Sequence, residues 1–164
     1  MSCVMSRQAA LQTPVLHTLH PGDVACGNGG ERFETLLGSC VAVILTDPRR
    51  TIGAMCHIVH ARTALPGTRP SGAYGDVALR MMYAQLQRRG ITPGKCEAYV
   101  YGGGNMFPDM FRERHVGQTN SDWVLDALAD DGIAVIREDV GGAMCRRLAW
   151  TVGKDKPQVE SVPV

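Results

Sequence analysis

The stretch TLLGSCVAVILTDPRRTIGAMCHIVH, residues 35–60, decides the fold of this chain. Two apolar runs rich in Val, Ile and Leu flank the tetrapeptide Asp-Pro-Arg-Arg at 47–50, which has Asp first and Pro second, as type I turns favour. Apolar runs bounded by turn residues are typical of buried strands. The pattern predicts a hairpin with a long strand over residues 33–47 and a return strand over residues 51–60.

Cys40 and His57 are the residues of this hairpin whose side chains are best suited to catalysis. If Asp47 faces Arg50 across the turn, Cys40 lies directly opposite His57 in the antiparallel pair. Facing residues have Cβ atoms about 4.5–5.5 Å apart, so the thiol and the imidazole would meet. A slip in register or a bulge would separate them.

The residues alone leave two interpretations of Cys40 open. It is a small packing residue of a Val-rich strand, or it is a nucleophile. A nucleophile would gain from His57, because an adjacent imidazolium favours the reactive thiolate and the same ring can protonate a leaving group. The small residues Gly38 and Ser39 would leave backbone N–H groups free to bind a substrate oxyanion.

A metal or redox site is a third interpretation, because Cys56, His57 and His60 lie close together in the sequence. Neighbouring residues of a strand point to opposite faces, so these three side chains would converge only in a distorted strand. The chain has six cysteines but no Cys-x-x-Cys pair, which argues against a structural zinc site. We therefore expect no metal.

Length and composition indicate a single globular domain. The chain has 164 residues, 45% hydrophobic and 20% charged, with a net charge of +1, which are ordinary values for such a protein. This charge gives no reason to expect binding to nucleic acid or to an anionic membrane surface. No stretch approaches the roughly 20 apolar residues that cross a bilayer, and the first residues lack the apolar core of a signal peptide. We expect a cytoplasmic protein with reduced thiols.

Helices and loops can be placed beyond the hairpin. Residues 61–75 form a Pro- and Gly-rich segment, and loops of this length are usually functional or mobile. Residues 74–90 have apolar side chains at helical spacing and end in basic residues and a glycine, which predicts a helix. A second helix is predicted over residues 117–132, with Asn120 or Ser121 as its N-cap.

The order of elements defines the expected fold class and domain organisation. Further strands are predicted within residues 14–34 and at 96–106, 133–139 and 145–152. Together the elements indicate an α/β fold, a layered sandwich of mixed, largely antiparallel sheet with outer helices; the hairpin does not fit a simple Rossmann order. We find no internal repeat or linker. The predicted segments are a flexible N-terminus (1–14), one domain (15–153) and a C-terminal tail (154–164).

Seven short motifs follow one another along almost the whole chain, over roughly residues 15–153. They are TLLGSCVAV, GAMCHIV, YGDVAL, YGGGNM, GQTN, DDGIAVIREDVGG and CRRLAW. No single motif is decisive. In this order, and with the cysteine and histidine placed as they are, they make the sequence similar to the chemoreceptor glutamine deamidase family, CheD.

The resemblance implies an activity, a fold and residue roles. Members of the family hydrolyse the side-chain amide of particular glutamines on chemotaxis receptors, which gives glutamate and ammonia. Their fold resembles the catalytic domain of the cytotoxic necrotizing factor toxins, a layered α/β sandwich with a Cys–His pair. Carried over to this sequence, Cys40 is the nucleophile and His57 the base, and Thr35 is the nearest match to a threonine that assists them. No cofactor is implied.

The resemblance also implies partners. They are the cytoplasmic helices of chemotaxis receptors and, as in some relatives, the phosphatase CheC. The family usually has an MLP-like stretch soon after its histidine, whereas HIVHARTALPG, residues 57–67, carries extra residues before Leu-Pro, which bears on receptor specificity. The alternatives are a non-catalytic adaptor that docks on receptors or on a phosphatase, and another thiol enzyme such as a transglutaminase or amidase.

Overall fold

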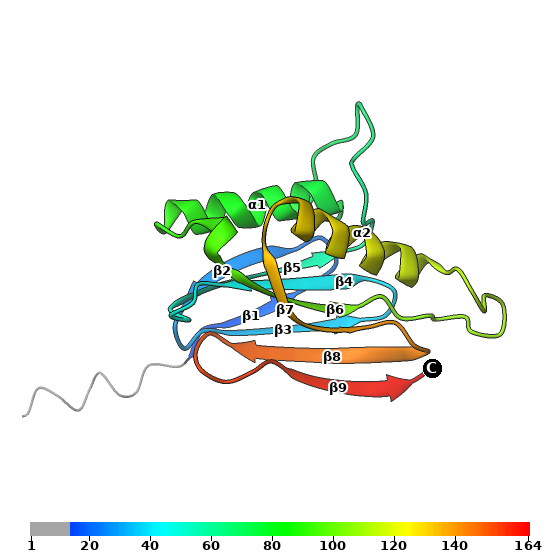
Figure 1. Cartoon of the computed structure of the whole chain (residues 1–164). Coiled ribbons are helices and arrows are strands. Elements are labelled where there is room, and N and C mark those ends of the chain that lie inside the picture. The colour runs from blue at the N-terminus through cyan, green and yellow to red at the C-terminus, as the bar shows by residue number, and fades with distance from the viewer. Residues whose placement is uncertain (1–13) are drawn as a thin grey trace, which may run out of the picture.

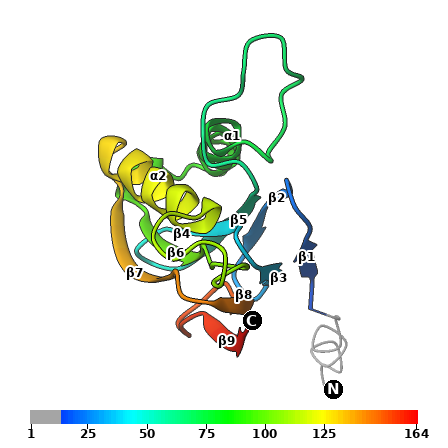
Figure 2. The ribbon, with the colours of Figure 1, turned by 90° about the vertical axis from the view of Figure 1, so that its right-hand side faces the viewer.

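Two helices cover one face of a five-stranded sheet, and a four-stranded sheet packs on its other face (Figures 1 and 2). This arrangement is seen in a computed structural model that describes residues 14–164. The expected flexible N-terminus lies outside the described residues except for Pro14. Within the described residues, no helix has the length and apolar character needed to span a membrane.

The elements follow the predicted alternation of strands and helices. The strands are β1 (Leu16–Leu19), β2 (Val24–Asn28), β3 (Arg32–Leu37), β4 (Val41–Thr46), β5 (Ile52–Ile58), β6 (Glu97–Gly102), β7 (Ala134–Val140), β8 (Met144–Thr151) and β9 (Gln158–Pro163). The helices are α1 (Gly75–Arg88) and α2 (Val116–Asp130), and the short 3-10 helix η2 (Pro93–Lys95) precedes β6.

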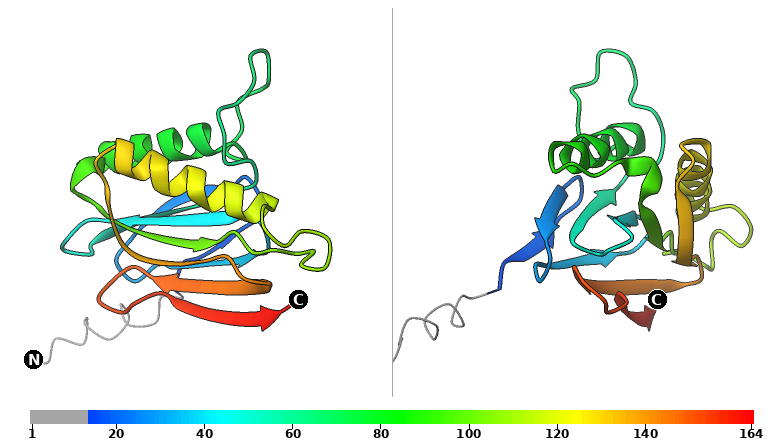
Figure 3. Two further views of the ribbon diagram at one scale, coloured as in Figure 1. Left: turned by 45° about the vertical axis from the view of Figure 1, so that its right-hand side comes forward. Right: turned by 60° about the vertical axis from the view of Figure 1, so that its left-hand side comes forward.

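Both sheets are mixed and largely antiparallel, as the sequence predicts. The four-stranded sheet has the order β1-β3-β8-β9, and only the β1–β3 pair is parallel. The five-stranded sheet has the order β2-β5-β4-β6-β7, and only the β6–β7 pair is parallel. The α/β class and the layered arrangement with outer helices are therefore confirmed. Figure 3 shows the layers from two further sides, with the segment between β5 and α1 projecting beyond α1.

The predicted long strand over 33–47 is in fact two strands in different sheets. β3 ends at Leu37 and pairs with β1 and β8, whereas β4 begins at Val41 and pairs with β5 and β6. The chain crosses between the sheets at residues 38–40. β3 alternates between buried and more exposed side chains, whereas β4 is buried along its whole length because helices cover one face and a sheet the other.

The hairpin exists, but its register differs from the predicted one. The turn forms, with Arg50 N–H donating to Asp47 O at 2.8 Å, yet regular pairing resumes only at Thr46 and Gly53. Arg50 has a φ of 58°, and the Asp47 carboxylate accepts hydrogen bonds from the N–H groups of Thr51 and Ile52. The loop is therefore longer than the predicted two-residue connection, and every pairing along the hairpin moves.

Three other expectations have mixed outcomes. The helix predicted over 74–90 is confirmed as α1. The second helix is confirmed, but its N-cap is His115, whose Nδ1 accepts from Gln118 N–H at 3.2 Å, and neither Asn120 nor Ser121 caps it. The expected tail over 154–164 contains β9, which pairs antiparallel with β8, so much of it belongs to the four-stranded sheet.

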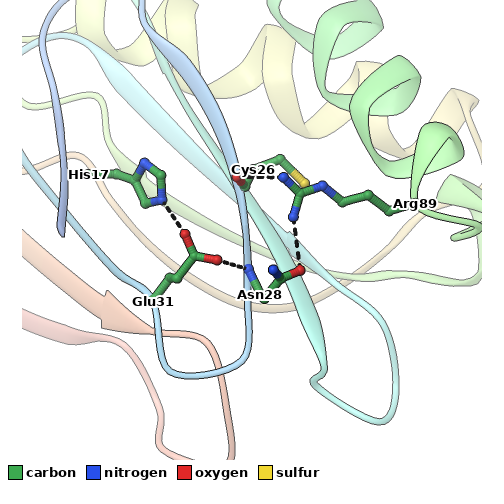
Figure 4. Close-up of polar contacts among 5 residues, drawn as sticks. All are labelled: His17, Cys26, Asn28, Glu31 and Arg89. Atoms are coloured by element: carbon green, nitrogen blue, oxygen red, sulfur yellow. Dashed lines mark hydrogen bonds and ion pairs between the residues drawn. The ribbon is translucent and has the colours of Figure 1, made fainter. Parts of the chain in front are cut away.

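A polar cluster fastens the end of α1 to the edge of the five-stranded sheet (Figure 4). Arg89 donates to the side-chain oxygen of Asn28 at 3.1 Å and to the carbonyl of Cys26 at 3.2 Å. Glu31 accepts from the backbone N–H of Asn28 and lies 2.9 Å from the His17 ring. The Asn28 hydrogen bond outweighs burial, and it lowers the pKa of the Glu31 carboxyl below its ordinary value.

We predict that Glu31 makes stability depend on pH. Because its pKa is lower in the folded protein, the unfolded chain binds the proton more readily; the stabilisation is present above the ordinary carboxylate pKa and is lost as pH falls. The free energy of unfolding in urea should therefore drop more in the wild type than in Glu31→Gln between about pH 5 and pH 3. The exposed Glu138, changed to Gln, is the control and keeps the wild-type slope. Equal slopes in wild type and Glu31→Gln would contradict this role.

Candidate active site

Cys40, His57 and Thr35 line one cavity, of about 560 Å³, that residues of both sheets enclose. Thr35 lies in β3, His57 in β5, and Cys40 at the crossing that precedes β4. The sequence thus predicted three residues that the fold brings together. The full lining consists of Thr18, Leu19, His20, Pro21, Glu34, Thr35, Leu36, Cys40, His57 and Arg147.

Cys40 and His57 are diagonal neighbours and not directly opposed. In the β4–β5 ladder His57 faces Ala42, and Cys40 precedes Ala42 by two residues. Diagonal pairs have Cβ atoms at most about 7–8 Å apart. No hydrogen bond joins the Cys40 thiol to the imidazole. Direct opposition is therefore wrong, although the two residues share a cavity because a step of two residues returns to the same face.

A hydrogen-bond chain fixes the orientation of His57. Thr35 Oγ1 donates to the carbonyl of Leu19 at 2.9 Å and lies 2.7 Å from His57 Nδ1. The hydroxyl has one proton, and a carbonyl oxygen can only accept, so the Thr35 hydroxyl donates its hydrogen bond to Leu19 O. His57 must then donate Nδ1–H to Thr35, which leaves the lone pair on Nε2. Both Thr35 and His57 are about 3% exposed, so this pairing also satisfies two buried polar groups.

The backbone of His57 is held by the turn between β1 and β2. Its N–H donates to the carbonyl of Asp23 at 3.0 Å, and its carbonyl accepts from Gly22 N–H at 2.9 Å. His20 and Pro21 of the same turn line the cavity. The motif HPGD therefore contributes to the site, and sequence reasoning, which predicted only strands within residues 14–34, assigned it no role there.

The electrostatics of the site favour a neutral pair. Burial raises the pKa of the Cys40 thiol above its ordinary value. Burial also lowers the pKa of the His57 imidazole, an effect that the Asp23 carboxylate opposes and His20 reinforces. Both directions favour a thiol beside a neutral imidazole in the resting site, whereas the sequence suggested a thiolate–imidazolium pair.

Each carbonyl group of the turn at residues 38–40 accepts a hydrogen bond. Gly38 O accepts from Gly104 N–H at 2.9 Å, and Cys40 O accepts from Gly103 N–H at 2.9 Å. Ser39 O accepts from the Asn120 side chain at 3.0 Å. None of the three N–H groups of this turn donates a hydrogen bond to a residue in the range 14–164. Of these three residues only Cys40 lines the cavity, so the oxyanion-binding role predicted for Gly38 and Ser39 stays a prediction.

The glycines of YGGGNM are needed because this loop packs against the turn. Gly102 and Gly103 have φ angles of 115° and 63°, a region that other residues rarely adopt. A Cβ on Gly102 would collide with the carbonyl oxygen of Cys40. The glycine loop therefore packs directly against residues 38–40 and supports them.

A second cavity, of about 590 Å³, lies on the other side of the turn. Ser39 and Asn120 line it, but Cys40, His57 and Thr35 do not. The segment after β5 contributes Ala61 and Arg62 to it. We base the functional assignment on the smaller cavity because it contains the candidate nucleophile and base.

The three residues of the alternative metal site do not converge. Cys56 packs in the core beneath the helices, where burial raises the pKa of its thiol to about 12. His57 points into the cavity on the other face, and His60 is exposed and lies beside Tyr74, with ring centroids 5.2 Å apart and the rings tilted. Among residues 14–164, no three His, Cys, Asp or Glu side chains are grouped as a metal site requires.

Comparison with known proteins identifies the group to which this chain is similar. The family model described as CheD chemotactic sensory transduction matches residues 62–161. "Probable chemoreceptor glutamine deamidase CheD 2" from Albidiferax ferrireducens is 37% identical over 152 residues, which is 90% of this chain and 86% of that protein. An alignment of this extent includes residues 35–57, which lie outside the family-model match.

Two further relatives come from other organisms. "Probable chemoreceptor glutamine deamidase CheD" from Methanococcus vannielii is 36% identical over 131 residues, covering 80% of this chain and 85% of that protein. "Chemoreceptor glutamine deamidase CheD" from Thermotoga maritima is 32% identical over 126 residues, covering 77% of this chain and 78% of that protein. The similarity thus extends across most of each chain.

We predict that Cys40 reacts slowly with iodoacetamide below the pH at which an ordinary thiol ionises. Burial raises its pKa and no imidazolium pairs with it, so half-maximal alkylation should lie above about pH 8.5. Mass spectrometry of the Cys40 peptide measures the rate, and the exposed Cys145 provides an internal reference. His57→Ala should leave the midpoint almost unchanged. A midpoint near neutrality that His57→Ala abolishes would instead establish a resting ion pair.

Proposed function

The chain belongs to the CheD family, and we propose from this premise that it is a chemoreceptor glutamine deamidase with Cys40 as nucleophile, His57 as base and Thr35 as the residue that orients the base. The enzyme would hydrolyse glutamine side chains on the cytoplasmic helices of chemotaxis receptors. The relatives carry the name of this activity.

The observation that carries the proposal is the hydrogen-bond chain from Leu19 through Thr35 to His57. It leaves an unprotonated Nε2 on a ring that shares its cavity with Cys40. A general base must offer a lone pair at its operating pH, and burial lowers the pKa of His57, which keeps that lone pair available. A packing role for Cys40 gives no reason for such an arrangement beside it.

The reaction proceeds through a thioester. As Cys40 attacks the amide carbon, its proton moves to His57 Nε2 and a C–S bond forms. The protonated ring then donates that proton to the departing nitrogen, the C–N bond breaks and ammonia leaves. Nε2 next takes a proton from water, whose oxygen attacks the thioester carbon. The C–S bond breaks, glutamate is released and the proton returns to the Cys40 sulfur.

Backbone N–H groups of Gly38, Ser39 and Cys40 are proposed to bind the oxyanion of both tetrahedral intermediates. They carry no other hydrogen bond within the described chain, and their carbonyl groups are already engaged. Donors fixed before the reaction stabilise the developing negative charge without reorganisation. The mechanism requires no metal and no organic cofactor.

The proposal extends to the surroundings of the enzyme. We propose that it acts in the cytoplasm, where the helices of its receptor substrates lie. We also propose the phosphatase CheC as a second partner, because some members of the family bind it. The pair of sheets, the outer helices and the Cys–His pair also support a fold similar to the catalytic domain of the cytotoxic necrotizing factor toxins.

We predict that Cys40→Ala abolishes deamidation while the protein still folds. The substitution removes the nucleophile but little volume at a half-buried position. Receptor cytoplasmic fragments incubated with each protein are digested, and mass spectrometry follows the conversion of glutamine to glutamate. Cys145→Ser, an exposed thiol outside the cavity, is the matched control and retains activity. Deamidation by folded Cys40→Ala would exclude the mechanism; receptor binding without deamidation by the wild type would favour the adaptor alternative.

We predict that Thr35→Val lowers kcat and Thr35→Ser retains most of it. Valine has no acceptor for Nδ1–H, so the proton moves to Nε2 and the base is lost. The loss should be about a hundredfold, the lower end of what general-base catalysis contributes. Nitrogen NMR of the His57 ring, measured on both variants, reports the tautomer directly. An unchanged tautomer in Thr35→Val would contradict the orienting role.

A further inference from the structure

The turn that carries Cys40 is held from outside its cavity by a side chain of α2. We propose that Asn120 is a positioning residue, whose side-chain amide sets the orientation of the Ser39–Cys40 peptide and so aims the Cys40 N–H into the active-site cavity. The inference rests on the proposed function, because it assigns a role relative to the nucleophile Cys40.

Asn120 uses its whole side-chain amide to join three distant segments. It is 4% exposed, and its Nδ2 donates to Ser39 O at 3.0 Å and to Val59 O at 3.3 Å. Its Oδ1 accepts from Ala61 N–H at 3.2 Å. These partners fix which end of the amide is nitrogen, because carbonyls need a donor and an N–H needs an acceptor. A rotated amide would lose all three bonds.

Because the Ser39–Cys40 peptide is planar, the hydrogen bond from Asn120 to Ser39 O also determines the direction of the Cys40 N–H. In a trans peptide the carbonyl of one residue and the N–H of the next point in opposite directions, and no cis peptide occurs among the described residues. Asn120 holds Ser39 O toward α2. The Cys40 N–H must therefore point away from the helices, toward the layer between the sheets where Cys40 packs.

The preceding peptide, Gly38–Ser39, is oriented in the same way by a hydrogen bond from the glycine loop. Gly104 N–H holds Gly38 O, so the Ser39 N–H points away from the glycine loop. Without Asn120, the Ser39–Cys40 peptide could turn over and present the Ser39 carbonyl to the developing oxyanion. Two like partial charges would then meet, which would raise the barrier that an N–H donor lowers. Asn120 excludes that orientation without touching the substrate.

Two reagents separate this role from an effect on the thiol itself. p-Nitrophenyl acetate acylates Cys40 through a tetrahedral oxyanion: a C–S bond forms, the ester C–O bond breaks, nitrophenolate leaves, and the thiol proton passes to His57 and then to solvent. Iodoacetamide alkylates the same sulfur by displacing iodide, with no oxyanion at the reacting carbon. Mass spectrometry of the Cys40 peptide gives both rates, so other thiols do not contribute.

Asn120→Asp is the test variant, because it retains the acceptor for Ala61 N–H and replaces the donor that faces Ser39 O. We expect acylation to fall about 10–100-fold, approaching the loss of one oxyanion donor, while alkylation changes less than about twofold. Val124→Ala, a buried apolar position one turn further along α2, is the stability control and keeps the wild-type ratio of the two rates. Thermal melting identifies the folded variants.

Equal losses in both rates, or no loss in either, would overturn the positioning role. If Asn120→Asp does not fold, Asn120→Ala is judged by the same ratio, since it removes the donor without burying a charge. Neither reagent requires a receptor. A wild type that is acylated normally but deamidates no receptor would therefore refute the proposed function alone, whereas a deamidating wild type with an unchanged ratio in the variant would refute this inference alone.

Discussion

The hydroxyl group of Thr35 makes the contact on which the candidate site depends. It lies in one sheet and joins His57 in the other, so the stacking of the two sheets sets the position of the imidazole. Because the Thr35 hydroxyl donates to the carbonyl of Leu19, it can only accept from His57, and the contact also sets the tautomer of the His57 ring. One buried hydrogen-bond chain thus fixes where the ring lies and which nitrogen carries its lone pair.

The passage of the chain between the sheets is the second constraint. β3 and β4 belong to different sheets, and only residues 38–40 connect them. Within this short crossing each carbonyl must find a partner, and the partners come from the glycine loop and from α2. Within residues 14–164 the three N–H groups of the crossing have no hydrogen-bond acceptor. One of them belongs to Cys40, which lines the cavity.

Local pattern predicted the elements well and their connections poorly. The two helices and most of the strands have periodic side chains or turn residues that the sequence displays directly, and these predictions are confirmed, whereas β9 was missed because the last residues were predicted to be a tail. The long strand over 33–47 was wrong because an apolar run does not reveal that its two halves pair with different partners. The predicted hairpin register was wrong because the carboxylate of Asp47 binds the N–H groups of Thr51 and Ile52. The loop is longer as a result, and strand pairing begins two residues later than predicted.

The sequence by itself determined the α/β class, the alternation of elements, the family resemblance and the common face of Cys40 and His57. That last prediction survived the register error because pairing moved by two residues, and side chains on a strand repeat with a period of two. Only the tertiary structure decided that Thr35 meets His57 across the sheets and that Asn120, 81 residues along the chain from Ser39, holds the turn before Cys40. These contacts depend on how separate layers pack, and local periodicity encodes which face of an element is buried without encoding which residue it will meet there.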